Sequence, residues 1–364
     1  MKFLHISDLH IGKKLNNISL IEDQRHILKQ IIDIAKNLDA VVIAGDVYDK
    51  SMPAAEAVEL LDEFLTELSS INIPIMIISG NHDSPERLAF GSKIMKNIHI
   101  CTEYKGKLEK FTVDDVDFYL LPFVKPQTVR GCLGDDELND YNEMAKLIFT
   151  DFQKEGKSVL VMHQFVTNGK NEPELGGSEV INVGTLDNIS TRYLNEFDYV
   201  ALGHIHKPQN VTEKIVYCGS PLKYSFAESY GEKYAIIVDT DNDMQTEKIP
   251  LVPLRDMRRL KGRLEDLIAN STDTDDYLHI TLTDEEPVVD AVGKLRNVYK
   301  NVLEITFEKD KKYIMQSVVT DKDIREKTTF ELFNEFYKEQ NGTDMSEAQI
   351  ELVKGILEEA EKSI

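Results

Sequence analysis

Side chains that bind metals or transfer protons follow five short apolar runs of the chain, each at the point where the run ends. They are Asp8, His10, Asp46, Asn81, His82, Asp83, His163, His204 and His206. Five of the nine histidines of the chain lie in these clusters. Alternate residues of an extended segment point the same way, so both members of an Asp-x-His or His-x-His pair can face one cleft.

The chemistry of this set is that of a metal centre without sulfur. Its members offer imidazole, carboxylate and amide groups, which favour Mn²⁺, iron or Zn²⁺ over a cysteine-rich structural zinc site. Seven potential ligands are too many for one ion and suit two ions that share a bridging group. Two ions about 3.5–4 Å apart can activate water and stabilise both the attacking and the leaving oxygen at phosphorus. The pattern therefore predicts hydrolysis of a phosphoester.

The apolar runs before these clusters predict the elements that position them. They are residues 3–6, 40–44, 75–78, 159–162 and 199–202, and their Val- and Ile-rich composition is typical of strands buried on both faces. Helix-period segments lie between them, with one apolar face from Ile27 to Leu38 and another from Ala57 to Leu68. Strands that alternate with helices predict an α/β layered domain, whose site lies at the carboxyl ends of the strands.

The pattern changes near residues 250–253, so we expect the first domain to cover residues 1–255. A small α+β domain is predicted over 256–310, with helices at 258–270 and 288–299 and strands at 277–282 and 302–307. A polar linker at 311–327 then leads to two C-terminal helices within 328–364. The first helix stops at Asn341-Gly342, and the second opens with a capping box from Ser346 to Gln349.

Composition limits the cellular compartment and the binding partners that can be expected. The 364 residues hold no run of about 18 apolar residues that could cross a membrane, and the three cysteines are scattered, which predicts free thiols in the cytoplasm. A net charge of -22 argues against tight binding of nucleic acid by this chain alone. One basic cluster stands out: Arg255, Arg258, Arg259, Lys261 and Arg263 form either a solvated face or a contact with DNA phosphates.

The wider text around the clusters resembles a known family. Asp8-Leu-His10, Gly45-Asp46, Gly80-Asn81-His82-Asp83, His163 and Gly203-His204-Ile-His206 look like the five motifs of calcineurin-like metallophosphoesterases. The stretches GDVYDKSMP, SGNHDSPERL, MHQFVTNG, FDYVALGHIHKPQ and CGSPLKYSF resemble the SbcD family of bacterial nuclease subunits. The resemblance is strong to about residue 255. It implies a layered β-sandwich flanked by helices, with an α+β capping domain and C-terminal helices.

The resemblance also implies roles for the nine side chains. One metal ion would be held by Asp8, His10, Asp46 and His206, and the second by Asp46, Asn81, His163 and His204, with Asp46 as the bridge. His82 would be no ligand, but would face the scissile phosphate and protonate the leaving 3′-oxygen. Asp83 would orient that imidazole, and Asp49 is a candidate supporting or structural carboxylate.

The activity implied by the resemblance is Mn²⁺-dependent 3′→5′ exonuclease on double-stranded DNA and endonuclease on single strands and hairpins. Such a nuclease acts in DNA repair, recombination and replication, in association with the nucleoid. Its partner is an SbcC-type ATPase, in a heterotetramer of two nuclease and two ATPase subunits. The domain at 256–310 would cap the site, and the last residues would dock on the partner.

Other interpretations stay open on the sequence alone. A dimetal phosphodiesterase that acts on a small nucleotide shares the five motifs but does not need a cap and aromatic C-terminal helices. A non-enzymatic protein of the same fold would be expected to lack ligands that are present here. The helix at Ala57–Leu68 is either core or part of a homodimer bundle. Phe330, Phe333 and Tyr337 form either a local core or an anchor for a partner.

Overall fold

The computed structural model describes residues 1–133, 138–169, 172–177, 188–286 and 288–308, and residues 330, 333–334, 337–338, 345–346, 349–350, 352–353 and 356. Two compact units divide the chain. The first contains Met1–Thr281 and Val289–Ile305, and the second contains Leu282–Val288 and Thr306–Ile364. The predicted linker at 311–327 lies outside the described residues.

The first sheet contains the strands that carry three of the five motifs. Its order is β16 (Gln245–Pro250), β15 (Tyr234–Asp239), β1 (Lys2–Ile6), β4 (Ala40–Ala44), β5 (Ile75–Ile78) and β6 (Ile98–Cys101). Strands β1, β4, β5 and β6 run parallel, whereas β15 and β16 are antiparallel to their neighbours. The predicted runs at 40–44 and 75–78 coincide with β4 and β5.

The second sheet carries the other two motifs. Its order is β13 (Gln209–Asn210), β14 (Ile215–Tyr217), β12 (Tyr199–Gly203), β9 (Lys157–His163), β8 (Val116–Leu121) and β7 (Glu109–Val113). The four strands from β14 to β8 are parallel, and β13 and β7 close the two edges in antiparallel pairing. The predicted strands at 159–162 and 199–202 are confirmed within β9 and β12.

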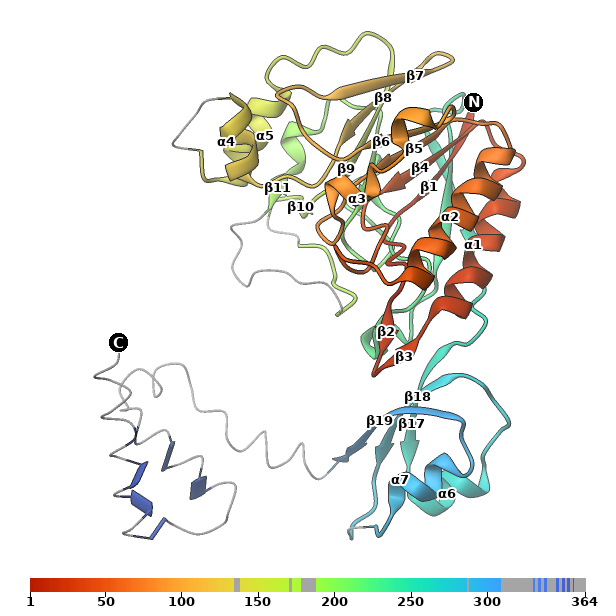
Figure 1. Cartoon of the computed structure of the whole chain (residues 1–364), viewed down its shortest axis with the longest axis vertical. Helices are drawn as coiled ribbons and strands as arrows, with labels where there is room; N and C mark the ends of the chain where they lie inside the picture. The colour runs from red at the N-terminus through yellow and green to blue at the C-terminus, as the bar shows by residue number, and fades with distance from the viewer. Residues whose placement is uncertain are drawn as a thin grey trace. The chain divides into compact units, whose positions relative to one another are not determined.

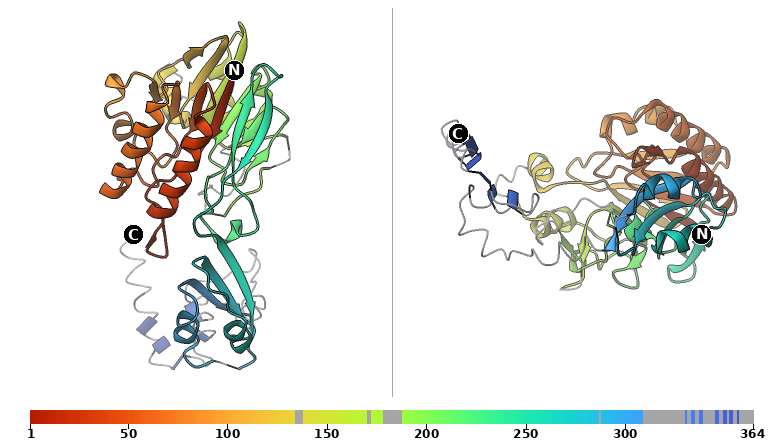
Figure 2. Two further views of the ribbon diagram at one scale, coloured as in Figure 1. Left: turned by 90° about the vertical axis from the view of Figure 1, so that its right-hand side faces the viewer. Right: turned by 90° about the horizontal axis from the view of Figure 1, so that it is seen from below.

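The two sheets pack face to face between two pairs of helices (Figure 1). Buried side chains from both sheets, among them Phe3, Val42, Phe118 and Tyr199, form the core between them. Helices α1 (Ile21–Ala35) and α2 (Ala55–Ser70) cover the outer face of the first sheet, which Figure 2 shows from a second side. Helices α4 (Pro126–Leu133) and α5 (Tyr141–Phe149) cover the second sheet. The predicted α/β class and layered sandwich are confirmed.

Short elements connect these layers. They are β2 (Lys14–Leu15), β3 (Ile18–Ser19), α3 (Pro85–Leu88), the 3-10 turn η1 (Ser92–Ile94), β10 (Val166–Thr167), β11 (Ile189–Ser190), and the 3-10 turns η2 (Thr191–Tyr193) and η3 (Phe226–Glu228). The helix predicted over Ala57–Leu68 is α2, whose apolar face packs into the core. Among the described residues, no helix has the length and apolar character needed to cross a membrane.

A small α+β region follows the sandwich, and most of it belongs to the same compact unit. Its sheet has the order β17 (Met257–Gly262), β18 (Tyr277–Leu282) and β19 (Asn301–Phe307), and its helices are α6 (Leu264–Ala269) and α7 (Ala291–Arg296). The helix predicted over 258–270 is wrong in its first half, because Met257–Gly262 is an edge strand. The helix predicted over 288–299 is present only at its centre, as α7, and the strands predicted at 277–282 and 302–307 are confirmed.

Within the first unit, this α+β region is tied to α1 through a buried carboxylate. The Arg255 guanidinium donates to both oxygens of Asp23, at 3.0 and 2.6 Å, and the Tyr277 hydroxyl donates to one of them at 2.9 Å. Asp23 is 1% exposed. A bidentate arginine–carboxylate pair fixes orientation as well as distance, so this contact sets how the chain enters β17.

The second unit contains one of the two hydrogen bonds of the predicted capping box. The amide of Ser346 donates to the side-chain oxygen of Gln349 at 2.9 Å, as a capping box requires, and the Ser346 hydroxyl donates to the same oxygen at 2.9 Å. The side-chain amide of Gln349 also donates to the Tyr337 hydroxyl at 3.0 Å, which joins two segments whose described residues are helical.

Candidate metal centre

The five motifs meet at one edge of the sandwich. Three follow β1, β4 and β5 of the first sheet, and two follow β9 and β12 of the second sheet. The two sheets approach closely here, because a Cβ atom on Gly203 would collide with the carbonyl oxygen of Ala44. Each sheet therefore presents its strand ends to the other, and all nine predicted side chains lie around this junction.

The backbone at this edge is strained in a way that is typical of functional sites. Asp8, His10, Asp46 and His204 have φ angles of 53°, 44°, 48° and 97°. Such left-handed conformations cost on the order of 1–3 kcal/mol for a non-glycine residue. Hydrogen bonds hold two of these turns together: Asp8 donates to the Gly45 carbonyl at 3.0 Å and His10 donates to the Asp46 carbonyl at 2.9 Å.

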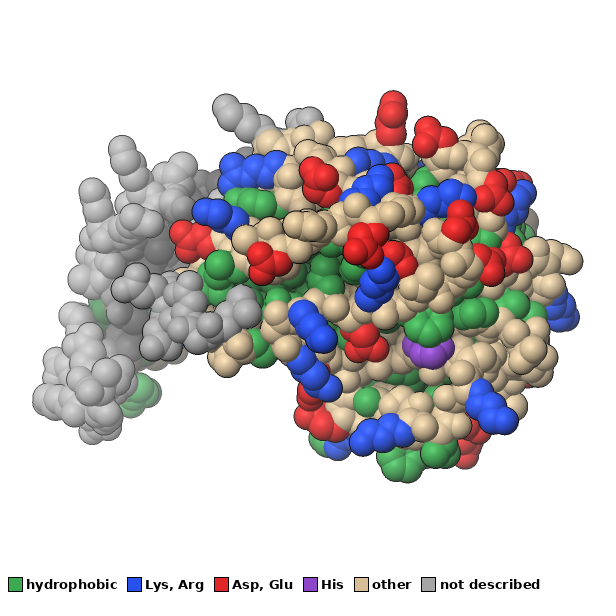
Figure 3. Space-filling view, turned by 90° about the horizontal axis from the view of Figure 1, so that it is seen from above, with side chains coloured by type: hydrophobic (Ala, Val, Ile, Leu, Met, Phe, Trp, Pro, Cys, Tyr) green, Lys and Arg blue, Asp and Glu red, His purple; other side chains and the backbone are tan. Residues whose placement is uncertain are grey.

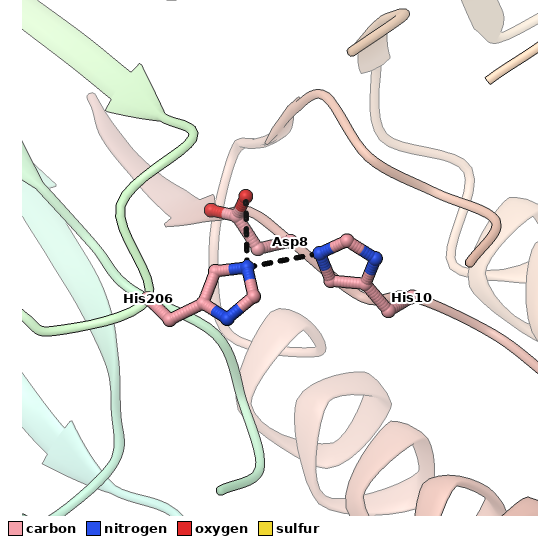
Figure 4. Close-up of side chains that lie close together, drawn as sticks. All are labelled: Asp8, His10 and His206. Atoms are coloured by element: carbon pink, nitrogen blue, oxygen red, sulfur yellow. Dashed lines mark hydrogen bonds and ion pairs between the residues drawn. The ribbon is translucent and has the colours of Figure 1, made fainter. Parts of the chain in front are cut away.

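The first cluster contains Asp8, His10 and His206, whose side chains point toward one another in Figure 4. The Nε2 atoms of His10 and His206 lie 3.0 Å apart, and Nε2 of His206 lies 4.0 Å from an Asp8 oxygen. All three side chains are buried, at 2% exposure or less. These are three of the four ligands predicted for the first ion, and the fourth, Asp46, has an oxygen 3.5 Å from His10 Nε2.

The second cluster lies on the other side of Asp46. The same Oδ2 atom of Asp46 is 3.4 Å from Nε2 of His163. The side-chain oxygen of Asn81 lies 3.1 Å from that nitrogen and 2.9 Å from Nδ1 of His204. Asp46 thus contacts a histidine of each cluster, which is the position that a bridging carboxylate would take.

The donor atoms of the first cluster fit a divalent cation. Burial lowers the pKa of His10 to about 3 and holds that of His206 well below its ordinary value, so both rings are neutral and offer lone pairs. The Nδ1 atom of His10 points away from the cluster, 3.7 Å from an oxygen of Asp49. Nε2 is therefore the nitrogen that faces His206 and Asp46. Two facing imidazole nitrogens with lone pairs suit a shared cation.

The second cluster fits a cation through the tautomer of His163. Its Nδ1 lies 2.8 Å from the carbonyl oxygen of Ala44, which can only accept, so Nδ1 carries the proton. Nε2 is therefore the nitrogen that faces the cluster. A metal-binding histidine usually donates its other ring N–H to a carbonyl or carboxylate in this way. Although burial opposes it, Asp46 raises the pKa of His163 to about 9 in the absence of a cation.

The two buried carboxylates, Asp8 and Asp46, also lie where a neighbouring positive charge would stabilise them. Burial raises the pKa of Asp8 to about 7, with His163 opposing the rise and Asp46 adding to it. Burial would also raise the pKa of Asp46, but the neighbouring His163 and His10 hold it below its ordinary value. Two carboxylates at 2% exposure or less are unfavourable unless they are paired or bind metal.

His82 lies at the open side of the first cluster. Its amide donates to Oδ1 of Asp46 at 2.9 Å, and its Nδ1 lies 2.8 Å from the carbonyl oxygen of Asp49. Because a carbonyl only accepts, Nδ1 is the protonated nitrogen. A nitrogen of His82 also lies within 4.8 Å of ligand atoms of His10 and Asp46, and the ring is partly exposed.

Asp83 acts differently from the sequence expectation, whereas Asp49 has the structural contacts expected of a supporting carboxylate. Asp83 accepts hydrogen bonds from the amides of Tyr48, Gly80 and Val47 at 2.8, 2.9 and 3.1 Å. The partner of the His82 imidazole, expected to be Asp83, is the backbone of Asp49. Asp83 therefore fixes the turns after β4 and β5. The Asp49 carboxylate pairs with Lys13 at 2.8 Å.

Other charged and ring side chains outside the motifs have structural partners. His5 contacts the Tyr199 hydroxyl at 3.0 Å, and His99 packs on Phe111. In the predicted basic cluster, Arg258 pairs with Asp276 and Arg259 donates to the carbonyl of Phe226. Arg255 is held by Asp23, so Arg255, Arg258 and Arg259 each have an internal partner.

Sequence reasoning did not assign roles to three residues that touch the centre. The Tyr224 ring packs edge-on against His10, the amide of Gln24 donates to the His10 carbonyl at 2.7 Å, and the Phe123 ring stacks on His204. Only Tyr224 lies within a stretch that the sequence analysis singled out, CGSPLKYSF. None of the three follows a motif strand, so the strand-end pattern could not reveal them.

Comparison with known proteins agrees with this geometry. The family model described as calcineurin-like phosphoesterase matches residues 1–208. The SbcD_C model, described as the type 5 capsule protein repressor C-terminal domain, matches residues 253–341. The chain therefore belongs to the calcineurin-like phosphoesterases, a family of metal-dependent hydrolases, and within it to the SbcD proteins.

One curated relative is similar over nearly the whole chain. The SbcD component of the nuclease SbcCD from Staphylococcus epidermidis is 30% identical over 375 residues, which cover 98% of each chain. Solved structures match less well: TT1561 of Thermus thermophilus has a TM-score of 0.37 at 12% identity, covering 69% of this chain and 99% of its own. A cold-active protein-tyrosine phosphatase of Shewanella has a TM-score of 0.29 at 13% identity, covering 68% and 80%.

Proposed function

We propose that this chain is the nuclease subunit of a DNA-processing complex and that its centre holds two divalent metal ions, with Mn²⁺ as the preferred metal. The observation that carries the proposal is the position of Asp46, whose Oδ2 contacts His10 of one cluster and His163 of the other. Asp8, His10, Asp46 and His206 would hold one ion. Asp46, Asn81, His163 and His204 would hold the second.

When bound, two such ions supply Lewis-acid chemistry and a nucleophile for attack at phosphorus. The chain's own contribution is to hold the ligands without further rearrangement. The backbone of Ala44 fixes the tautomer of His163, and the strained turns at Asp8 and Asp46 direct both carboxylates into the junction. Preorganised groups of this kind need little reorganisation during reaction.

His82 is proposed as the general acid that protonates the leaving oxygen. Its Nδ1 is bound to the Asp49 carbonyl, so Nε2 is the nitrogen that exchanges a proton with substrate. The partly exposed ring lies beside His10, with ring centroids 4.8 Å apart. A group at the solvent side of the cluster can reach the leaving group of a bound phosphodiester.

The proposed substrate and partner come from the relatives. Similarity to an SbcCD nuclease component over 98% of the chain favours DNA over a small nucleotide, and so does the match of a family model to residues 253–341. We propose Mn²⁺-dependent 3′→5′ exonuclease on duplex ends and endonuclease on single strands and hairpins, in cytoplasmic DNA repair. An SbcC-type ATPase would be the partner, in a heterotetramer built on a homodimer of this chain.

The test compares the wild type with His82→Ala on end-labelled DNA in Mn²⁺, with single-stranded, hairpin and duplex substrates. Loss of the general acid should reduce cleavage about 10²–10⁴-fold, while the Mn²⁺ content stays near that of the wild type. A chromogenic small phosphodiester runs beside the DNA. Turnover of that diester alone, with or without the ATPase, would exclude the nuclease, and an empty metal site in His82→Ala would make His82 a ligand.

A further inference from the structure

A buried lysine lies directly behind the first cluster. The Lys233 ammonium donates to the carbonyl oxygen of His206 at 2.7 Å and to the Ser220 hydroxyl at 2.8 Å, and it forms an ion pair with Glu228. The side chains of Lys233 and Glu228 are 5% and 4% exposed. Three acceptors thus surround one cation at the backbone of a proposed ligand.

The turn at Gly219 brings this group against His206. Gly219 has a φ of 79°, and a Cβ atom there would lie 2.6 Å from the His206 carbonyl oxygen. The next amide, that of Ser220, donates to the same oxygen at 3.2 Å. Two donors, the Ser220 amide and the Lys233 ammonium, therefore fix the peptide plane of His206, and only glycine allows the approach.

Glu228 links Lys233 to Tyr224, whose ring contacts His10 as well as His206. Its other oxygen accepts from the amide of Tyr224 at 3.1 Å, and the Tyr224 hydroxyl donates to the carbonyl of Leu9 at 2.5 Å. The Tyr224 ring packs edge-on against both imidazoles, with centroid distances of 5.5 Å to His10 and 5.9 Å to His206. A single ring thus restrains two proposed ligands of one ion.

The energetics of this arrangement argue against a purely stabilising role. A fully buried ion pair often contributes little to stability, because desolvation offsets the attraction, and apolar replacement of both partners is often neutral. What the pair supplies here is direction, since both of its members bond to the backbone of segments that carry or contact His206 and His10. Groups that orient metal ligands are commonly worth about 10–100-fold in metal affinity.

We propose that Lys233, Glu228 and Tyr224 are positioning residues that hold His206 and His10 in place for the first metal ion. The proposal rests on the ligand set proposed above. It gives a role to the stretch CGSPLKYSF, which the five motifs leave without one. It also predicts that substitutions of these three residues weaken the first metal site and not the second, because the second cluster is fixed by the Ala44 carbonyl.

The test measures Mn²⁺ binding by isothermal titration, together with kcat on a chromogenic phosphodiester over a range of Mn²⁺ concentrations. The main variant is the double substitution Lys233→Met with Glu228→Met, which leaves no buried charge unpaired and should fold. We expect one of the two Mn²⁺ dissociation constants to rise about tenfold or more while the other stays within about twofold. Excess Mn²⁺ should restore kcat. Tyr224→Leu, which removes the ring contacts without touching a charge, should shift the same constant.

Leu68→Ala serves as a control for loss of stability alone. Leu68 is buried in α2, where it packs in the outer helical layer, and its truncation should leave both dissociation constants unchanged. Two unchanged constants in the folded double variant and in Tyr224→Leu would overturn the positioning role. Failure of the wild type to bind two Mn²⁺ ions would instead overturn the proposed dimetal centre, so the two failures are distinguishable.

Discussion

At the scale of single residues, the centre concentrates features that a protein otherwise avoids. Four non-glycine residues have left-handed backbones, and two carboxylates are buried beside the imidazoles of the motifs. Each feature costs stability, and a divalent cation bound among the donors would offset the cost of burying the two carboxylates. The residues that could hold metal are therefore the same residues at which these costs gather.

The pKa shifts predict that metal binding releases protons. In the metal-free protein, His163, with a pKa raised to about 9, is protonated at about pH 8, whereas Asp8, raised to about 7, is mostly ionised. Mn²⁺ must displace the proton of His163 at about pH 8, and those of both groups below about pH 7. Affinity should therefore fall by about tenfold per pH unit from about pH 9 to 7, and more steeply below.

The release is measured as the difference in binding heat between two buffers of unlike ionisation enthalpy at about pH 8. About one proton per protein should appear in the bulk. Heats that do not depend on the buffer would contradict the protonation state assigned to His163. Because His163 also holds down the pKa of Asp8, the matched control is the double variant Asp8→Asn with His163→Asn, which removes both titrating groups. Any Mn²⁺ binding that remains in it should release no proton at this pH.

The proposed metal ligands could be predicted from the sequence, but the residues that pack behind them could not. All seven proposed ligands lie at or just after the ends of motif strands, so their types and positions pointed to one edge of the sheets. Tyr224 and Lys233 follow no such rule. Their contacts with His10 and His206 arise from long-range packing of residues 219–233, which carries no local signal.

At the scale of elements, the turns after β4 and β5 depend on one buried carboxylate. Asp83 accepts from three backbone amides, two of them in residues 47–48 and the third at Gly80. These turns carry Asp46 and Asn81. A carboxylate that satisfies several amides at once can fix two loops more firmly than side-chain packing alone.

Asp83→Ala should therefore affect both stability and activity. Three buried amides would lose their acceptor at a cost of about 1–3 kcal/mol each, so we expect the free energy of unfolding to fall by about 3 kcal/mol or more. Urea denaturation measures it. Asp62→Ala, which removes an exposed acid from α2, is the control. An unfolding free energy like that of the control would show that the turns do not depend on Asp83.

Element prediction succeeded where the local pattern and the tertiary structure agree. The buried strands β4 and β5 were located to the residue, because an uninterrupted apolar run has few other uses. The segment Met257–Gly262 was misread as a helix because its Arg, Leu and Lys residues favour helices. As the edge strand beside β18 it tolerates those charges, and only the pairing reveals it.

At the scale of the whole molecule, charge and surface bear on the proposed partner. The chain carries a net charge of -22, and on the face shown in Figure 3 acidic and basic side chains are interspersed. The described part of that face offers no broad basic surface for DNA. High affinity for duplex DNA is therefore expected to need the ATPase, which would supply phosphate contacts.

Two exposed apolar side chains among the described residues of the second unit are candidates for contact with the proposed partner. Leu352 and Ile356 are 64% and 57% exposed, and their spacing places them on one side of a helix. The double substitution Leu352→Glu with Ile356→Glu should abolish co-purification with an SbcC-type ATPase while hydrolysis of single-stranded DNA continues. Leu147→Glu, on helix α5 of the sandwich, is the control. Undiminished co-purification of the double variant would show that Leu352 and Ile356 do not contact the ATPase.

The central claim is that Asp46 is shared by two metal ions, and an anomalous difference map from crystals grown with Mn²⁺ tests it most directly. The account predicts two peaks within coordination distance of the Asp46 carboxylate. One should lie toward His10 and His206, and the other toward Asn81, His163 and His204. A single peak, or peaks away from Asp46, would contradict the dimetal centre and the nuclease chemistry derived from it.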